Sequence, residues 1–140
     1  MILYLDTSAL VKKYVDEKHS AEVIAAWKSA WGIATSAVAY AELLAAIYRK
    51  ASEPRVKKAR IERVVRFFQE DWSCLIIVAA DQRLNEAVHK VIAGHSLRGF
   101  DAIHLALALT IGAAVSDEFL FGCYDDRLNQ AARAEGLKTF

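Results

Sequence analysis

The 140-residue sequence contains few of the residues that form linkers or crosslinks. With 1 Pro and 6 Gly, it has no stretch whose composition indicates a linker or a disordered tail. Its 2 cysteines, Cys74 and Cys123, lie far apart without a CxxC spacing, which favours free buried thiols in a reducing cytoplasm over a disulfide framework. Because 55% of the residues are hydrophobic, enough for one continuous core, we expect a single domain spanning residues 1–140.

The sequence also lacks a strong net charge and a long apolar run. Its 18 Lys and Arg residues nearly balance 17 Asp and Glu residues, so composition alone does not indicate a nucleic-acid partner. The segment MILYLDTSALV has no basic leader and is interrupted by Asp6, which argues against a secretory signal. No apolar run reaches the roughly 18 residues that span a bilayer. We therefore expect a cytoplasmic protein without membrane association.

Apolar, β-prone segments alternate with helical segments along the chain. The predicted strands are residues 2–5, 32–35, 74–79, 119–124 and 138–140, and the continuously apolar third one is expected to be fully buried. The predicted helices are residues 7–15, 20–30, 37–50, 54–69, 81–92, 100–111 and 126–134. We expect Thr7 or Ser8 to cap the first helix, Ser36 to cap the third, and Pro54 to lie in the first turn of the fourth. The alternation predicts an α/β fold, with helices flanking a mostly parallel sheet.

Four carboxylates stand apart from the other acidic residues. Most Asp and Glu residues lie beside other charges, which is typical of a solvated surface. By contrast, Asp6 ends the run LYLD, and Glu42 is the only charge in AVAYAELLAAI. Asp101 opens the apolar segment FDAIHLALAL, and Asp125 follows FLFGCY. A carboxylate in apolar surroundings loses much of its hydration, so each of the four needs a cation, a hydrogen-bond donor or a metal.

These four residues suggest a metal site at one edge of the sheet. Asp6 and Asp125 are expected where parallel strands end, and open α/β sheets place their ligand crevice there. If Glu42 and Asp101 project to the same edge from flanking helices, the cluster calls for a hard divalent cation such as Mg²⁺ or Mn²⁺. Structural alternatives stay open: Asp6 and Asp125 could cap helices, and Asp101 suits a helix N-terminus. A purely structural role is harder to find for Glu42, which lies within its predicted helix.

Two further features bear on this hypothesis. His104 lies three residues after Asp101 and could face the same cleft. We interpret it as a hydrogen-bonded core or boundary residue, outside the metal set. The segments DQRLNEA, from Asp81, and DDRLNQA, from Asp125, are similar, and both follow an apolar strand. We interpret the pair as two helix caps and not as a repeat.

Four segments, taken in order, resemble the acidic motifs of one protein family. They are LDTSALVKKY at the start, TSAVAYAELLAA near residue 40, LRGFDAIHLALAL near residue 100 and YDDRLNQAARAEGL near the end. Together they resemble the motifs of VapC-type PIN domains, the toxins of bacterial and archaeal toxin–antitoxin pairs. Each segment is weakly specific by itself. The four occur in the right order and at similar spacing, and the resemblance extends over essentially the whole chain.

The resemblance implies both a topology and a site. The implied PIN fold has a central five-stranded, mostly parallel sheet in the order 3-2-1-4-5. The implied site is an acidic pocket that binds Mg²⁺ or Mn²⁺ and consists of Asp6, Glu42, Asp101 and Asp125.

Three supporting residues are also implied. Ser8 matches a small polar position that orients a carboxylate or a metal-bound water, and Arg98 either meets a phosphate or is a solvated loop residue. The spacing to Leu128 selects Asp125 over its neighbour Asp126, which either caps the helix or reaches the metal through water. Cys123 departs from the family, because Thr or Ser is common at that position.

The implied function is that of a metal-dependent endoribonuclease toxin. Bound metal would activate water and draw charge from the phosphate, leaving 5′-phosphate and 3′-hydroxyl ends without a protein nucleophile. The implied partners are an RNA substrate, a VapB-like antitoxin and a second copy of the chain in a homodimer. The Lys and Arg residues of segment 55–66 either guide RNA or form a solvated face. Trp27 and Trp31 either anchor a partner helix or pack inside the monomer.

Two other protein classes fit the sequence less well. A phosphatase of the haloacid dehalogenase type needs a D-x-D sequence, and Ser8 occupies the second acidic position. A receiver domain needs an acidic pair near the first strand and a later Lys after a strand, and neither is found. The remaining alternative is a catalytically inactive PIN-like module that binds RNA or protein. Because all four acidic positions are filled, we favour the enzyme.

Overall fold

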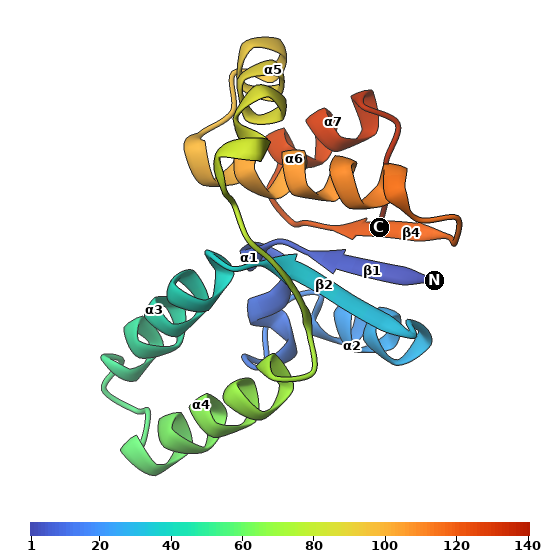
Figure 1. Ribbon diagram of the computed structural model, residues 1–140. Coiled ribbons are helices and arrows are strands. Elements are labelled where there is room, and N and C mark those ends of the chain that lie inside the picture. Colours follow the sequence, from blue (N-terminus) through green and yellow to red (C-terminus); the bar gives the residue numbers. More distant parts are fainter.

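The computed structural model describes residues 1–140 and contains one sheet of five parallel strands (Figure 1). The strands are β1 (Ile2–Leu5), β2 (Gly32–Ser36), β3 (Ile76–Val78), β4 (Phe119–Gly122) and β5 (Lys138–Thr139). They lie in the order β3-β2-β1-β4-β5, and each neighbouring pair is parallel. The predicted α/β fold and the predicted strand order are confirmed.

Helices cover both faces of this sheet (Figure 1). One face carries α1 (Thr7–Leu10), α2 (Ser20–Ser29), α3 (Ala39–Ala51) and α4 (Lys58–Trp72). The other carries α5 (Asn85–His95), α6 (Gly99–Ala114) and α7 (Asp126–Ala134). Two short 3-10 helices, η1 (Val11–Lys13) and η2 (Gln82–Leu84), follow α1 and precede α5.

The central strand β1 divides the core into two parts. Leu3 and Leu5 belong to the cluster under α1 to α4, whereas Ile2 and Tyr4 belong to the cluster under α5 to α7. All four side chains are buried because alternate residues of a strand point to opposite faces of the sheet. The burial fixes the position of β1, and with it the position of the residue that follows, Asp6.

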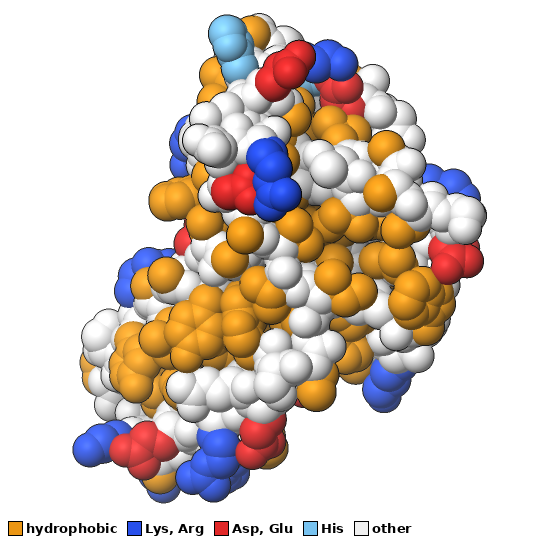
Figure 2. Space-filling model, viewed as in Figure 1, with side chains coloured by type: hydrophobic (Ala, Val, Ile, Leu, Met, Phe, Trp, Pro, Cys, Tyr) orange, Lys and Arg blue, Asp and Glu red, His pale blue; other side chains and the backbone are white.

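Aromatic side chains join α3 to α4. The ring centroid of Tyr40 lies 5.1 Å from those of Phe68 and Trp72, and the Phe68 and Trp72 centroids are 5.5 Å apart. Figure 2 shows apolar side chains gathered on the visible face over this pair of helices. The contacts hold α3, which carries Glu42, against the rest of its layer.

Two predicted helix starts were wrong. The first helix is capped by Asp6 and not by Thr7 or Ser8, because the Asp6 carboxylate accepts the Ala9 N–H at 2.9 Å. This helix also ends early, since η1 stops at Lys13. The third begins at residue 39 without a side-chain cap; the Ser36 hydroxyl accepts the N–H of residue 38 at 3.3 Å, within the preceding turn.

Pro54 lies outside the helix that it was expected to begin. The preceding helix α3 continues to Ala51, and the N–H of Val56 then donates to the carbonyl of Glu53 at 3.1 Å. Pro54 is therefore the second residue of a tight turn, a position that its fixed φ favours. Helix α4 begins four residues later, at Lys58.

The expectation of a fully buried third strand was also wrong. β3 is only three residues long, and its Ile76 and Ile77 are 42% and 36% exposed. The reason is its position, because β3 pairs with β2 alone and forms an edge of the sheet. Cys74, which precedes it, is exposed, whereas Cys123 is buried as predicted.

No single helix is long and apolar enough to cross a membrane. Only when they are taken together do the segments Gln82–His95 and Gly99–Ala114 have the length and apolar composition of a membrane span, and the chain bends by 116° between them. The second of these segments is α6, whose residues Ala102 and His104–Ala108 are buried in the core.

Candidate active site

The predicted carboxylates lie around the carboxyl ends of the two central strands. Asp6 directly follows β1, and its N–H donates to the carbonyl of Gly122, the last residue of the neighbouring strand β4, at 3.0 Å. Asp125 follows β4 after two intervening residues. Glu42 and Asp101 lie in the first turns of α3 and α6. Parallel strands thus place four chain segments at one edge of the sheet, as predicted from the sequence.

Two cavities connect three of these carboxylates. Glu42 and Asp101 line a cavity of about 500 Å³, and Asp101 and Asp125 line a second of about 560 Å³. Asp6 lines neither cavity and is only 4% exposed. Its neighbour Ser8 lines a third cavity, of about 620 Å³, together with Glu42. The structure therefore brings Glu42, Asp101 and Asp125 to one cleft, with Asp6 buried beside it.

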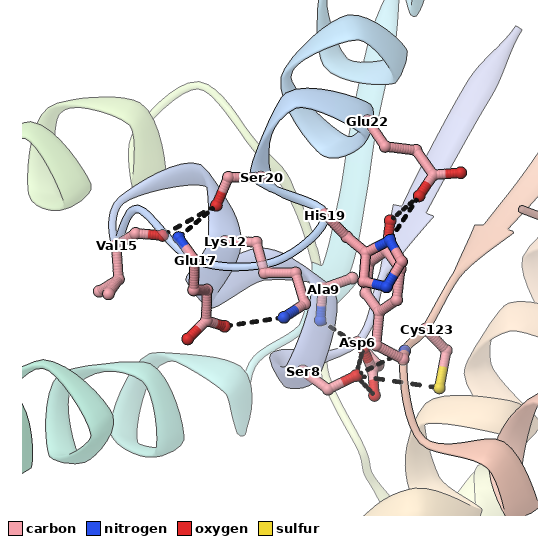
Figure 3. Close-up of polar contacts among 11 residues, drawn as sticks. Asp6, Ser8, Ala9, Lys12, Val15, Glu17, His19, Ser20, Glu22 and Cys123 are labelled. Atoms are coloured by element: carbon pink, nitrogen blue, oxygen red, sulfur yellow. Dashed lines mark hydrogen bonds and ion pairs between the residues drawn. The ribbon is translucent and has the colours of Figure 1, made fainter.

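Hydrogen bonds from its own segment hold Asp6 in place (Figure 3). Its Oδ1 accepts the Ala9 N–H, and the Ser8 hydroxyl lies 2.7 and 2.9 Å from the two carboxylate oxygens. Burial raises the pKa of Asp6 above its ordinary value, while His104 and these donors oppose the rise. Ser8 orients this carboxylate, which is one of the two roles expected of it.

Ser8 also connects the ends of β1 and β4. Its Oγ accepts the N–H of Tyr124 at 2.8 Å, and its hydroxyl approaches the Cys123 sulfur at 3.9 Å (Figure 3). The Cys123 sulfur in turn accepts the N–H of Asp125 at 3.2 Å. The thiol thus stands at the position where the resemblance implies a hydroxyl. Burial raises the pKa of this thiol, so it remains a neutral group and not a thiolate ligand.

Glu42 is held by a buried network from three other elements. Thr7 donates its hydroxyl to Glu42 Oε1 at 2.7 Å, and His104 Nε2 lies 3.3 Å from the same oxygen. His104 Nδ1 lies 3.1 Å from the hydroxyl of Tyr4. The hydrogen bond from His104 is the largest cause of the lowered pKa of Glu42, which Thr7 lowers further and burial opposes.

The network indicates which nitrogen of His104 carries a proton. Burial, followed by the charges of Asp6 and Glu42, raises the pKa of Tyr4, so its hydroxyl stays protonated. The Glu42 carboxylate can only accept a hydrogen bond, so His104 Nε2, which faces it, carries a proton. His104 is therefore a buried hydrogen-bonded residue, as expected, but one that contacts a site carboxylate directly.

Asp101 and Asp125 share one cation. Arg98 Nε lies 3.2 Å from Asp101 Oδ2, and Arg98 Nη2 lies 3.7 Å from Asp125 Oδ2. Asp125 also caps α7, because its Oδ1 accepts the Leu128 N–H at 2.9 Å. The cap expected as one possibility for Asp126 is thus supplied by Asp125. Asp126 is exposed, lines the same cavity as Asp125 and makes no side-chain hydrogen bond or ion pair.

The chemistry of this site suits a hard cation, although the side chains are not preassembled around one. No three Asp, Glu, His or Cys side chains are arranged to hold a metal ion. Each carboxylate is satisfied by protein groups instead, and two of them already share the guanidinium of Arg98. The available ligands are carboxylate oxygens, the type that hard divalent cations prefer, and one cation, the Arg98 guanidinium, already stands between two of them.

Three residues that support the site carboxylates were not included in the predicted site: Tyr4, Thr7 and His104. For His104, the spacing of three from Asp101 was a usable signal, since such residues share a helix face. For Tyr4, the signal was a phenol inside the apolar strand ILYL, because a buried hydroxyl needs a partner. Nothing in the sequence distinguished Thr7 from a helix cap.

These observations define a class of protein: a small α/β domain with an acidic cleft at the carboxyl ends of its central strands. The family model described as "PIN domain" matches residues 3–134. The chain belongs to the PIN domain family.

Curated relatives cover almost the whole chain. "Ribonuclease VapC46" of Mycobacterium tuberculosis (strain ATCC 25618 / H37Rv) is 30% identical over 135 residues, which are 96% of this chain and 93% of that protein. "Ribonuclease VapC45" of Mycobacterium tuberculosis (strain CDC 1551 / Oshkosh) is 28% identical over 138 residues, which are 99% of this chain and 94% of that protein.

Solved structures share the fold at lower identity. The "Crystal Structure of FitAcB from Neisseria gonorrhoeae" aligns with a TM-score of 0.71 and 17% identity over 100% of this chain and 96% of that one. VapBC2 from Rickettsia felis, bound to a promoter DNA fragment, aligns with a TM-score of 0.67 and 14% identity over 100% and 98% of the two chains. At these identities the likeness shows the fold alone.

Proposed function

We propose that this protein is an endoribonuclease toxin of the VapC type that hydrolyses RNA phosphodiester bonds and depends on Mg²⁺ or Mn²⁺. The observation that carries the proposal is the cleft at the ends of β1 and β4, where Glu42, Asp101 and Asp125 line adjoining cavities next to the buried Asp6. Relatives that span almost the whole chain are ribonucleases by name. Their activity and the acidic cleft support the same function.

The metal would be held by carboxylates of Asp6, Glu42, Asp101 and Asp125. When bound, it supplies a nucleophilic water at neutral pH and relieves the charge that develops on the phosphate. The residues around it fix the ligands. Ser8 orients Asp6, and the Thr7 and His104 groups hold one oxygen of Glu42.

Charged residues at the mouth of the cleft have different roles. Arg98 is 78% exposed and sits where it can also meet an RNA phosphate. Asp126, at the rim of the second cavity, is placed to hold a metal-bound water. The exposed Lys and Arg residues of segment 55–66, among them Arg60, Arg63 and Arg66 of α4, are proposed to guide RNA towards the cleft.

We further propose a VapB-like antitoxin and a second copy of the chain as partners in the cytoplasm. One solved structure that shares this fold is a "Toxin-antitoxin complex from Klebsiella pneumoniae" by title, and others are VapBC structures by title. The monomer also exposes large apolar side chains, including Phe100 (57%), Phe67 (55%) and Trp31 (64%). Phe100 lines two of the cavities at the site, so a partner covering it would lie next to the carboxylates. Trp27, in contrast, packs partly buried against the core.

Cleavage of a fluorescent single-stranded RNA tests the proposed activity. The purified protein should cut it with Mn²⁺ or Mg²⁺ and stop when EDTA is added. Asp6→Asn and Asp101→Asn should each slow cleavage by about 100-fold or more, because each removes several kcal/mol of charge stabilisation at tenfold per 1.4 kcal/mol. Both variants should keep the wild-type circular dichroism spectrum. Equal cleavage rates in all three proteins would contradict the assigned site and favour an inactive binding module.

Growth of the host tests the toxin function separately. Expression of the wild-type chain should arrest growth, whereas Asp101→Asn should not. Coexpression with the upstream reading frame should restore growth. Normal growth of cells that contain abundant, active wild-type protein would contradict the toxin function without contradicting the nuclease activity.

A further inference from the structure

Arg98 divides the acidic cleft in two. The cavity of about 500 Å³ and the cavity of about 560 Å³ have only Arg98 and Asp101 in common. Glu42 lies on one side of this boundary, and Asp125 lies on the other. If the Arg98 side chain turned away, Asp101 would be the only residue shared by the two cavities, with Glu42 on one side of it and Asp125 on the other.

The backbone of Arg98 is fixed, but its side chain is not. The residue has an extended backbone at the start of α6, and its neighbour Leu97 is buried in the core. The side chain is 78% exposed. Its contacts at 3.2 and 3.7 Å use two different nitrogens for two different carboxylates, so neither pair is a bidentate fork. Ion pairs of this exposed kind are weak and readily exchanged.

The side chains of the two carboxylates are less exposed than the side chain of Arg98. The Asp101 and Asp125 side chains are 21% and 35% exposed, and Asp125 is anchored as the cap of α7. Both use Oδ2 to contact Arg98. A divalent cation that takes those oxygens competes directly with the guanidinium, and it carries twice the charge in a smaller volume.

We propose that Arg98 is an exchangeable counter-ion, which pairs with Asp101 and Asp125 in the metal-free protein and leaves them when a divalent cation binds. Its departure opens the boundary between the two cavities. The freed guanidinium, still anchored at the start of α6, then lies at the mouth of the cleft and binds the phosphate of RNA. This inference rests on the proposed function, because it assumes that a divalent cation and RNA bind at this cleft.

Mn²⁺ titration by calorimetry, without RNA, tests the exchange. Removing two exposed ion pairs in Arg98→Ala should tighten Mn²⁺ binding by roughly 2- to 10-fold. Arg127→Ala is the matched control, because Arg127 lines the cavity of Asp125 but pairs with no carboxylate. It removes the same charge and should change the affinity less than Arg98→Ala does. Arg98→Lys keeps the charge without the planar fork and should lie between wild type and Arg98→Ala.

Two further measurements follow the arginine itself. In a Mg²⁺ titration followed by NMR, the Arg98 Nε–Hε signal should shift with the same midpoint as binding, whereas the Arg127 signal should not. At saturating Mn²⁺, Arg98→Ala should raise KM for RNA more than it lowers kcat. Tighter metal binding combined with weaker RNA binding is the combination that a merely structural arginine does not produce.

The outcomes separate this inference from the proposed function. If the wild-type protein binds Mn²⁺ and Arg98→Ala binds it no more tightly than Arg127→Ala, the exchange is wrong and the metal site stands. An Arg98 Nε–Hε signal that does not shift when Mg²⁺ is added would lead to the same conclusion. A wild-type protein that binds neither ion would overturn both proposals. Urea unfolding of each variant checks that the substitutions leave the fold intact.

Discussion

Two segments of this chain have nearly the same sequence and very different surroundings. DQRLNEA begins at Asp81, and DDRLNQA begins at Asp125. In both, the first Asp caps the helix that follows: Asp81 accepts the Arg83 N–H, and Asp125 accepts the Leu128 N–H, each at 2.9 Å. The interpretation of the pair as two helix caps is confirmed.

The difference lies in the strand that precedes each segment. Asp81 comes after β3 at the edge of the sheet, is exposed, and pairs only with its near neighbour Arg83. Asp125 comes after β4, which lies next to the central strand β1, and it meets Arg98 from another element. Local sequence thus determines the cap, and position in the sheet determines whether the carboxylate also joins a site.

The largest expected effect concerns catalysis. Asp125→Asn should lower RNA cleavage by about 100-fold or more, because it removes a charge from the proposed metal site, at tenfold per 1.4 kcal/mol. Asp81→Asn should cleave RNA at the wild-type rate. Asn caps helices about as well as Asp, so both variants keep their caps and differ in chemistry alone. If the fully folded Asp81→Asn variant cleaved RNA more slowly than the fully folded Asp125→Asn variant, the fourth carboxylate would have been assigned to the wrong segment.

A smaller effect concerns the free energy of unfolding in the absence of metal. A rise in pH should destabilise the fold through the buried Asp6 and stabilise it through the exposed Asp81. Burial raises the pKa of Asp6 above 3.8, so the folded protein holds that proton more tightly and ionisation lowers the free energy of unfolding as pH rises. Hydrogen bonds from Arg83 lower the pKa of Asp81 below 3.8, so its ionised form stabilises the fold, and this benefit is lost as pH falls.

Asp6→Asn should therefore be more stable than wild type at pH 7, and Asp81→Asn slightly less stable. Both differences should shrink as the pH is lowered through the folded-state pKa of the group concerned. Urea unfolding in EDTA at pH 7, at pH 5 and at about pH 3 measures them, because about pH 3 lies below the usual carboxyl pKa values of about 3.9 to 4.3. A loss of stability in Asp6→Asn at pH 7 would show that burial is not the main influence on that carboxylate.

The smallest effect concerns the caps themselves. Asp125→Ala should be less stable than Asp125→Asn by about 0.5 to 2 kcal/mol, because alanine cannot accept the Leu128 N–H. Asp81→Ala should lose less, since the 3-10 helix that it caps is three residues long and exposed at its start. Chemical unfolding of the two Ala–Asn pairs gives both values. Equal losses would mean that the two caps are equivalent despite their different surroundings.

The sequence predicted the strand order better than it predicted burial. The alternation of apolar strands and helices, together with the family resemblance, was sufficient for the sheet. An apolar run such as residues 74–79 has the same composition at the edge of a sheet as at its centre. Its exposure depends on which strands pair beside it, so β3 was wrongly expected to be buried.

The site shows the same limit. Asp6, Glu42, Asp101 and Asp125 were singled out because each interrupts or adjoins an apolar segment. Their hydrogen-bond partners were harder to find, because Tyr4 meets His104, and Ser8 meets Tyr124, from opposite ends of the chain. Such contacts depend on strand pairing and have no local pattern. The assignment of the four carboxylates as metal ligands remains a prediction.

The pairing of β1 with β4 also has a consequence for how the protein folds during its synthesis. Ile2 pairs with Phe119, so β1 is synthesised long before its neighbour β4. Contacts between such distant segments form late, because a long loop must close before they stabilise anything. A nascent chain that ends before Asp125 therefore has no complete cleft. The cleft, and any cleavage that depends on it, therefore becomes possible only after β4 and Asp125 have been synthesised.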